Sequence, residues 1–209
     1  MTTMAIVFDL AGVVFHWSPP QLLRETLPLL APDAAAADGL VQRLFQGFAP
    51  GSDWAEFDRG QVAPAALAER IAQRTGIAAH DVRAVIDAVP AHLSANPGTV
   101  DLMRRLKRAG HRLFYLSNMP APYAAHLERA HGFFDLFDDG IFSARVQLMK
   151  PDPAIFAAAA RRFGLAPAEL LFIDDSLPNV DAARALGWQA LHYRGAAECE
   201  AALPPGTLA

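Results

Sequence analysis

Five short apolar runs recur along the chain, and each is followed by polar residues or a turn. They lie near residues 4–8, 112–117, 140–143, 170–174 and 188–193. Between the later runs, apolar residues recur every three or four positions, which is the spacing of a helix with one buried face. Buried strands that alternate with such helices form a parallel sheet covered on both faces. The pattern therefore predicts an α/β fold.

The helices of this predicted core have recognisable ends. Asn96 can cap a helix in which Pro97 takes the first position, and Gly110 can end it. Further helices are expected over residues 152–164 and 178–186, because each begins near a proline and has a glycine at or just after its end.

Residues 17–95 interrupt the alternation of strands and helices. This segment has no convincing strand. It carries helical patterns at about 20–30, 34–48, 64–75 and 79–89. We expect a helical cap over residues 17–95, inserted after the first strand of a core formed by residues 1–16 and 96–209. Because the insertion leaves from the tip of that strand, it can act as a lid that excludes water from a site there. The alternative is a packing domain with no part in the chemistry.

Composition and charge narrow the classes of partner. The chain has 209 residues, of which 53% are apolar, and a formal net charge of −4, which argues against a nucleic-acid or anionic-membrane partner. The single cysteine, Cys199, cannot form an internal disulfide, and we expect an inert thiol in a cytoplasmic protein. The first apolar run is too short to span a bilayer and lacks a basic leader, so no targeting segment is expected.

Polar groups end four of the apolar runs. Asp9 ends the first, Ser117-Asn118 the second and Asp174-Asp175 the fourth; Ser143 ends the third, and Lys150 follows it in a loop. In an open parallel sheet the ligand site lies beyond the carboxyl ends of the strands. These strand ends should therefore deliver acids, a hydroxyl, an amide and a lysine to one crevice.

Three carboxylates in one crevice require a counter-charge. Each pair of like charges about 4 Å apart costs on the order of 4 kcal/mol at an effective dielectric of about 20. A divalent cation resolves this repulsion, and carboxylate ligands suit Mg²⁺. Lys150 is one of only two lysines in the chain and lies near a strand end. Singly, each group has a structural explanation as a cap, a turn or a surface charge. Together they form a set suited to phosphoryl transfer: a nucleophile, a metal, a cation and hydrogen-bond donors.

Four segments carry a resemblance to a known family. FDLAGVVF, YLSN, MKPDPAIF and FIDDSLPNVDAARALGW resemble the four motifs of the haloacid dehalogenase (HAD) superfamily. Within these motifs, the residues LSN, KPDP and DDSxxN are most similar to the branch with glucose-1-phosphatase-like enzymes and the N-terminal phosphatase domain of soluble epoxide hydrolases. The resemblance implies a Rossmann-like core with a helical cap after the first strand.

The resemblance also implies roles for individual residues. Asp9 would be the nucleophile and a Mg²⁺ ligand, and Asp175 would bind the metal. Lys150 would hold the nucleophile and the phosphate together. The remaining implied contacts are Ser117 and Asn118 to phosphate, with Asp174 and Asn179 supporting the metal site.

One position departs from the family pattern. Most phosphatases of this superfamily have a second aspartate, a general acid and base, where this chain has Ala11. Alanine keeps the backbone carbonyl that the family uses as a metal ligand, but the proton donor is lost. Gly12, in the turn that follows, is a candidate substrate contact. His16 is a candidate to replace the missing acid, because histidines commonly act as acids and bases in enzymes, although a surface or turn histidine is the simpler explanation. Trp54 can stack on a sugar, or else belongs to the core of the cap.

These observations predict a Mg²⁺-dependent phosphatase that acts on a small phosphomonoester through an aspartyl-phosphate. Loss of the acid favours activated or anomeric esters, with glucose 1-phosphate as the best single substrate. The alternatives are carbon–halogen or carbon–phosphorus hydrolysis and a non-catalytic protein that binds a phosphorylated metabolite. Phosphonate hydrolases of this family need a cap lysine, and residues 17–95 contain none. Metal-free dehalogenases do not need the Asp174-Asp175 pair. The sequence does not reveal the oligomeric state.

Overall fold

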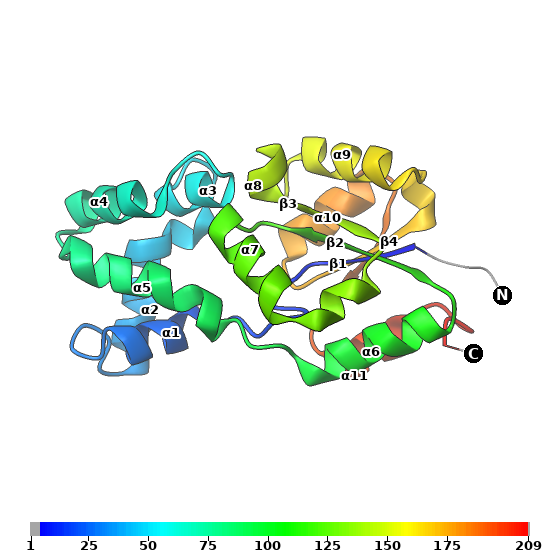
Figure 1. Cartoon of the computed structure of the whole chain (residues 1–209), viewed down its shortest axis with the longest axis horizontal. Helices are drawn as coiled ribbons and strands as arrows, with labels where there is room; N and C mark the ends of the chain where they lie inside the picture. The colour runs from blue at the N-terminus through cyan, green and yellow to red at the C-terminus, as the bar shows by residue number, and fades with distance from the viewer. Residues whose placement is uncertain (1–4, 209) are drawn as a thin grey trace.

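A five-stranded parallel sheet forms the centre of the molecule in the computed structural model, which describes residues 5–208 (Figure 1). The strand order is β3-β2-β1-β4-β5, and every neighbouring pair is parallel. The strands are β1 (Ala5–Phe8), β2 (Arg112–Ser117), β3 (Asp139–Phe142), β4 (Leu170–Asp174) and β5 (Gln189–His192). The predicted α/β fold is confirmed. Residues 1–4 and 209 of the expected core lie outside the described residues.

Both faces of the sheet are covered, as the run of buried residues in β1 requires. Alternate side chains of β1 enter two separate cores: Ile6 and Phe8 join one, and Val7 joins the other. In Figure 1, α9 and α10 lie over one face of the sheet, and α6 and α11 lie over the other. The helices of the core are α6 (Pro97–Arg108), α7 (Ala121–Ala130), α8 (Ser143–Val146), α9 (Pro153–Phe163), α10 (Leu177–Ala185) and α11 (Ala196–Ala202).

The predicted helix caps are present. The side chain of Asn96 accepts hydrogen bonds from the backbone amides of Gly98 and Thr99 at the start of α6. Asp152 caps α9 in the same way, and Gly164 ends that helix with a φ of 67°. Within residues 5–208, no helix is long and apolar enough to cross a membrane.

Between β1 and α6 the chain forms a group of helices beside the core, on the left of Figure 1. These are α1 (Pro19–Thr26), α2 (Ala34–Phe45), η1 (Gln46–Phe48), α3 (Asp53–Asp58), α4 (Pro64–Thr75) and α5 (Ala79–His92). The structure has no strand in this segment, as the pattern predicted. We retain residues 17–95 as the proposed limits of the cap.

The cap differs from the prediction in several places: α1 ends at Thr26, about four residues early, and α5 continues to His92, about three residues late. Helix α2 ends at Phe45, three residues before the predicted end, because Gln46 adopts a left-handed φ of 52° and a short 3₁₀ turn follows. Helix α3 was not predicted, because six residues are too few to show a helical period. At its end, the backbone carbonyl of Asp58 accepts a hydrogen bond from Ser143 Oγ, which ties α3 to the end of β3.

Candidate active site

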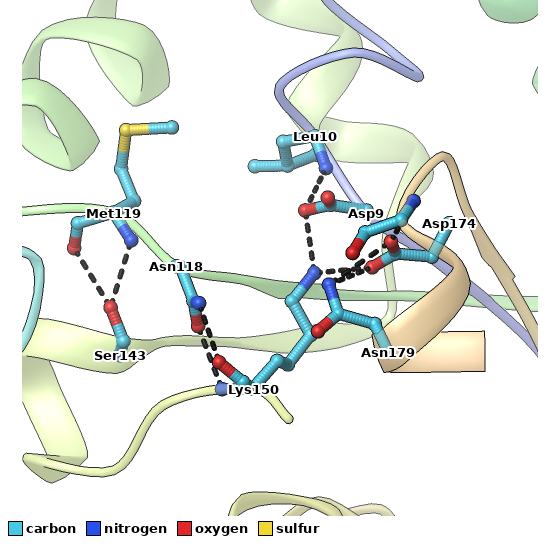
Figure 2. Close-up of polar contacts among 9 residues, drawn as sticks. Asp9, Leu10, Asn118, Met119, Ser143, Lys150, Asp174 and Asn179 are labelled. Atoms are coloured by element: carbon cyan, nitrogen blue, oxygen red, sulfur yellow. Dashed lines mark hydrogen bonds and ion pairs between the residues drawn. The ribbon is translucent and has the colours of Figure 1, made fainter. Parts of the chain in front are cut away.

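The carboxylates that end β1 and β4 meet at one edge of the sheet. Asp9 directly follows β1, Asp174 ends β4, and Asp175 is the next residue. One oxygen from each of the three carboxylates lies within 4.8 Å of the others. In Figure 2, dashed lines join the Lys150 ammonium group to both Asp9 and Asp174. The structure therefore brings together the acids that the sequence placed at separate strand ends.

Lys150 bridges two of these acids. Its Nζ lies 2.9 Å from Asp9 Oδ1 and 2.7 Å from Asp174 Oδ2, and the residue is only 3% exposed. Burial lowers the pKa of Lys150, but the two carboxylates outweigh burial and raise it. The lysine is therefore a fixed positive charge beside the predicted nucleophile.

The raised pKa of Asp9 indicates that Lys150 alone does not supply enough positive charge to keep this carboxylate ionised. Burial, together with the charges of Asp174 and Asp175, raises the pKa of Asp9 to about 7, although Lys150 acts in the opposite direction. Asp9 Oδ1 also accepts a hydrogen bond from the backbone amide of Leu10 at 2.7 Å. A bound cation would lower the pKa of Asp9 and keep its carboxylate ionised.

Asp174 is already fully engaged. Both of its oxygens accept from Asn179 Nδ2 at 3.1 Å, and Oδ1 also accepts from the backbone amide of Ser176 at 2.8 Å. Together with the contact to Lys150, these bonds make Asp174 a residue that positions the lysine. Asp9 and Asp175 are left with oxygens to offer a metal, and such hard donors fit Mg²⁺.

Gly12 makes room for Asp175. Its φ is 88°, and a Cβ built on it would lie 2.2 Å from Asp175 Oδ2. Burial and the charge of Asp174 raise the pKa of Asp175. The structure thus explains Gly12 by the close approach of a proposed metal ligand, whereas the sequence suggested a contact to substrate.

Ser117 and Asn118 end β2 beside this cluster. Ser117 is fully buried, and its Oγ is one of two buried side-chain atoms in residues 5–208 without a hydrogen-bond partner. Asn118 donates to the backbone carbonyl of Lys150 and accepts from its amide, both at 2.9 Å (Figure 2). Asn118 therefore holds the loop that carries Lys150. Its contact to a phosphate stays a prediction.

A cavity of about 420 Å³ extends from the acids into the cap. Asp9, Ala11, Asn118, Lys150, Asp175 and Asn179 line its core end. Trp54 lines the cap side and also packs against Phe45, with ring centroids 4.4 Å apart, so it belongs to the core of the cap and faces the cavity. Its stacking on a ligand stays a prediction. His16 is exposed and is not among the residues that line the cavity.

The sequence did not single out Asp58, which also lines the cavity. This residue ends α3 and is 7% exposed, and burial raises the pKa of its carboxyl to about 8. Asp58 lies four residues after Trp54, so the two share one face of α3. That spacing from an aromatic residue is the only signal in the sequence that could have found it.

Comparison with known proteins gives consistent results. A profile of haloacid dehalogenase-like hydrolases matches residues 3–187. The chain is 30% identical to the sesquiterpene phosphatase astK of Aspergillus oryzae, over 91% of this chain and 90% of the relative. It is 29% identical to a phosphoglycolate phosphatase of Thiobacillus denitrificans, over 88% and 79% of the two chains. A HAD family enzyme from Bacteroides thetaiotaomicron, solved with magnesium and inorganic phosphate, has the same fold, with a TM-score of 0.71 at 21% identity over 99% of both chains.

Proposed function

The chain belongs to the haloacid dehalogenase-like hydrolases, and from this premise we propose that it is a Mg²⁺-dependent phosphatase of a small phosphomonoester. The observation that carries the proposal is the Lys150 ammonium group, held between Asp9 and Asp174 at the core end of a cavity. A lysine beside a buried carboxylate suits a substrate that brings further negative charge to the nucleophile.

The proposed reaction has two steps. A carboxylate oxygen of Asp9 attacks phosphorus, the ester P–O bond breaks, and the alcohol leaves and takes a proton from water. Water then attacks phosphorus in the aspartyl-phosphate, which releases inorganic phosphate and restores Asp9. Lys150 neutralises charge on the phosphoryl oxygens. Ser117 Oγ, which has no hydrogen-bond partner among residues 5–208 and lies outside the cavity lining, is the proposed hydroxyl contact to one of them. Asp9, Asp175 and the Ala11 carbonyl would hold Mg²⁺, which supplies further charge neutralisation when bound.

The relatives support phosphate ester hydrolysis and leave the substrate open. One is named for a sesquiterpene phosphate and the other for phosphoglycolate, and these differ greatly in polarity. Glucose 1-phosphate, the substrate favoured by the sequence, is named in neither relative. The nature of the alcohol has to be inferred from the cavity.

Three alternative functions are less well supported. A metal-free dehalogenase has no need of three convergent carboxylates, which this chain retains. A Schiff-base phosphonate hydrolase needs a cap lysine, and both lysines of this chain lie in the core. A non-catalytic binding protein would have no need of a lysine fixed against a free carboxylate.

An assay of 4-nitrophenyl phosphate with and without Mg²⁺ tests the proposal. We expect turnover only with Mg²⁺ and none in Asp9→Asn, which is nearly isosteric and should keep the fold. Undiminished turnover in that variant would refute Asp9 as the nucleophile. Absence of turnover in the wild type, with Mg²⁺ still bound, would favour the binding protein.

A further inference from the structure

The cap side of the cavity is almost entirely apolar. Its large side chains are Trp17, Phe48, Trp54, Val89 and Leu93, and its small residues are Gly47, Ala49 and Pro50. The core extends this apolar surface with Met119, Pro120 and Tyr123. The charged and amide groups of the lining lie at the Asp9 end, with Asp58 as the single exception.

A sugar would find few partners in such a cavity. Apart from Asp58, no cap side chain in the lining carries a hydroxyl, an amide or a charge. The hydroxyl of Tyr123 is already used, since it donates to the backbone carbonyl of Ile86 at 2.7 Å. On the cap side, two indole N–H groups and one carboxyl are too few for the hydroxyls of a hexose, since Asn118, Ser176 and Asn179 lie at the core end. Each buried hydroxyl without a partner weakens binding.

Asp58 does not make the cavity polar at neutral pH. The carboxyl has no hydrogen-bond or ion-pair partner among residues 5–208, and burial raises its pKa to about 8, so it is mostly uncharged at pH 7. A neutral acid is compatible with a hydrocarbon beside it, whereas a carboxylate would repel a ligand that already carries phosphate.

We propose that the substrate is the monophosphate of an apolar alcohol or phenol, with its phosphate at Asp9 and its hydrocarbon part against Trp17, Phe48 and Trp54. This inference rests on the proposed phosphatase function. It replaces glucose 1-phosphate with a hydrophobic ester. A volume of about 420 Å³ is sufficient for a ligand of small-drug size.

A series of 4-alkylphenyl phosphates tests the inference, because lengthening the alkyl chain leaves the leaving-group pKa nearly constant. The catalytic efficiency with Mg²⁺ should rise about fourfold for each buried methylene until the cavity is filled. The longer members should also exceed glucose 1-phosphate and phosphoglycolate. Hydrolysis that is independent of chain length, or a preference for glucose 1-phosphate, would overturn the inference and leave the phosphatase function intact.

Variants of the cavity wall locate the effect. Phe48 and Trp17 are only partly buried, so Phe48→Ser and Trp17→Ser should fold. Both should flatten the dependence of catalytic efficiency on alkyl chain length. Leu29→Ser is the control, because Leu29 is an apolar cap residue that is 94% exposed and outside the lining. The assignment of the apolar wall would be contradicted if Leu29→Ser also flattened the dependence on chain length. It would also be contradicted if neither Phe48→Ser nor Trp17→Ser flattened it.

A binding measurement separates this inference from the phosphatase function. Octylphosphonate cannot be hydrolysed by attack on an ester bond, so its affinity for the Mg²⁺-loaded protein reports the cavity alone. Calorimetry should show at least tenfold tighter binding of octylphosphonate than of methylphosphonate, even if no phosphate ester is turned over. Equal affinities would reject the apolar substrate.

Discussion

The hydroxyl of Tyr123 donates a hydrogen bond to the backbone carbonyl of Ile86, which Pro90 leaves without its helical donor. Proline has no amide hydrogen, so in α5 it cannot complete the helical bond to Ile86, four residues earlier. Tyr123 of α7 donates to that carbonyl at 2.7 Å instead, and both groups are buried. A core helix thereby completes the hydrogen bonding of a cap helix.

Tyr123→Phe should destabilise the protein by about 1–3 kcal/mol, because it leaves a buried carbonyl without a donor. Pro90→Ala restores the amide, so the same tyrosine change should cost less in the alanine background. Urea unfolding of the four proteins measures the coupling. Additive effects would show that the tyrosine and the proline are independent.

Lys150→Ala should reduce catalytic efficiency strongly, because it removes the charge partner of two buried carboxylates. Loss of such a partner costs about 2–5 kcal/mol, which is a decrease of about 30-fold to several thousand-fold. Lys107→Ala is the matched control, since the only other lysine forms a partly exposed pair with Asp138. A decrease of less than tenfold at Lys150 would indicate a structural role.

Gly12→Ala should weaken Mg²⁺ binding, because the new methyl group displaces the Asp175 carboxylate and φ at this position is positive. The control is Gly39→Ala, where no atom lies within 4 Å of the added Cβ. Calorimetric titration with Mg²⁺ compares the two. An unchanged affinity in Gly12→Ala would count against Asp175 as a ligand.

Asp58 should make stability depend on pH. Its folded pKa of about 8 lies above the ordinary value of 3.8, so between these values the folded state holds a proton that the unfolded state releases. The stabilisation is complete below about pH 4 and is lost as pH rises towards 8, at no more than about 1.4 kcal/mol per pH unit. Asp58→Asn should remove this slope. Urea unfolding at pH 5 and pH 7.5 compares the proteins, and parallel profiles would show that Asp58 is ionised in the fold.

Ala11 should make the rate sensitive to the leaving group. A general acid typically contributes about 10²–10⁴-fold, mostly for poor leaving groups, so the plot of log rate against leaving-group pKa should be steeply negative. Ala11→Asp should flatten it if the new carboxylate reaches the leaving oxygen. A flat plot in the wild type would mean that another group donates the proton.

Much of the core could be predicted because its signals are local. The strand at 170–174 and the cap helix at 64–75 have the predicted bounds, since apolar runs and periodicity determine them. Helix α7 was not placed, because nothing in the pattern distinguished it within the long connection between β2 and β3. The residues of the acid cluster were found because strand ends in a parallel sheet converge by topology.

The cavity could not be predicted in this way. Asp58 is acidic in a short amphipathic segment, and only the docking of α3 against the core buries it. Val89, Leu93 and Met119 follow ordinary core spacing, and no local pattern separates a residue that lines a cavity from one that fills a core.

Part of the apolar wall lies in one short stretch of sequence. Phe48, Trp54 and Asp58 lie within the segment that joins α2 to α4, and the acids and Lys150 lie outside it. On the proposed function, insertions or exchanges between Phe45 and Gly60 would change which alcohol is accepted and leave the strand ends with the proposed reacting groups unchanged.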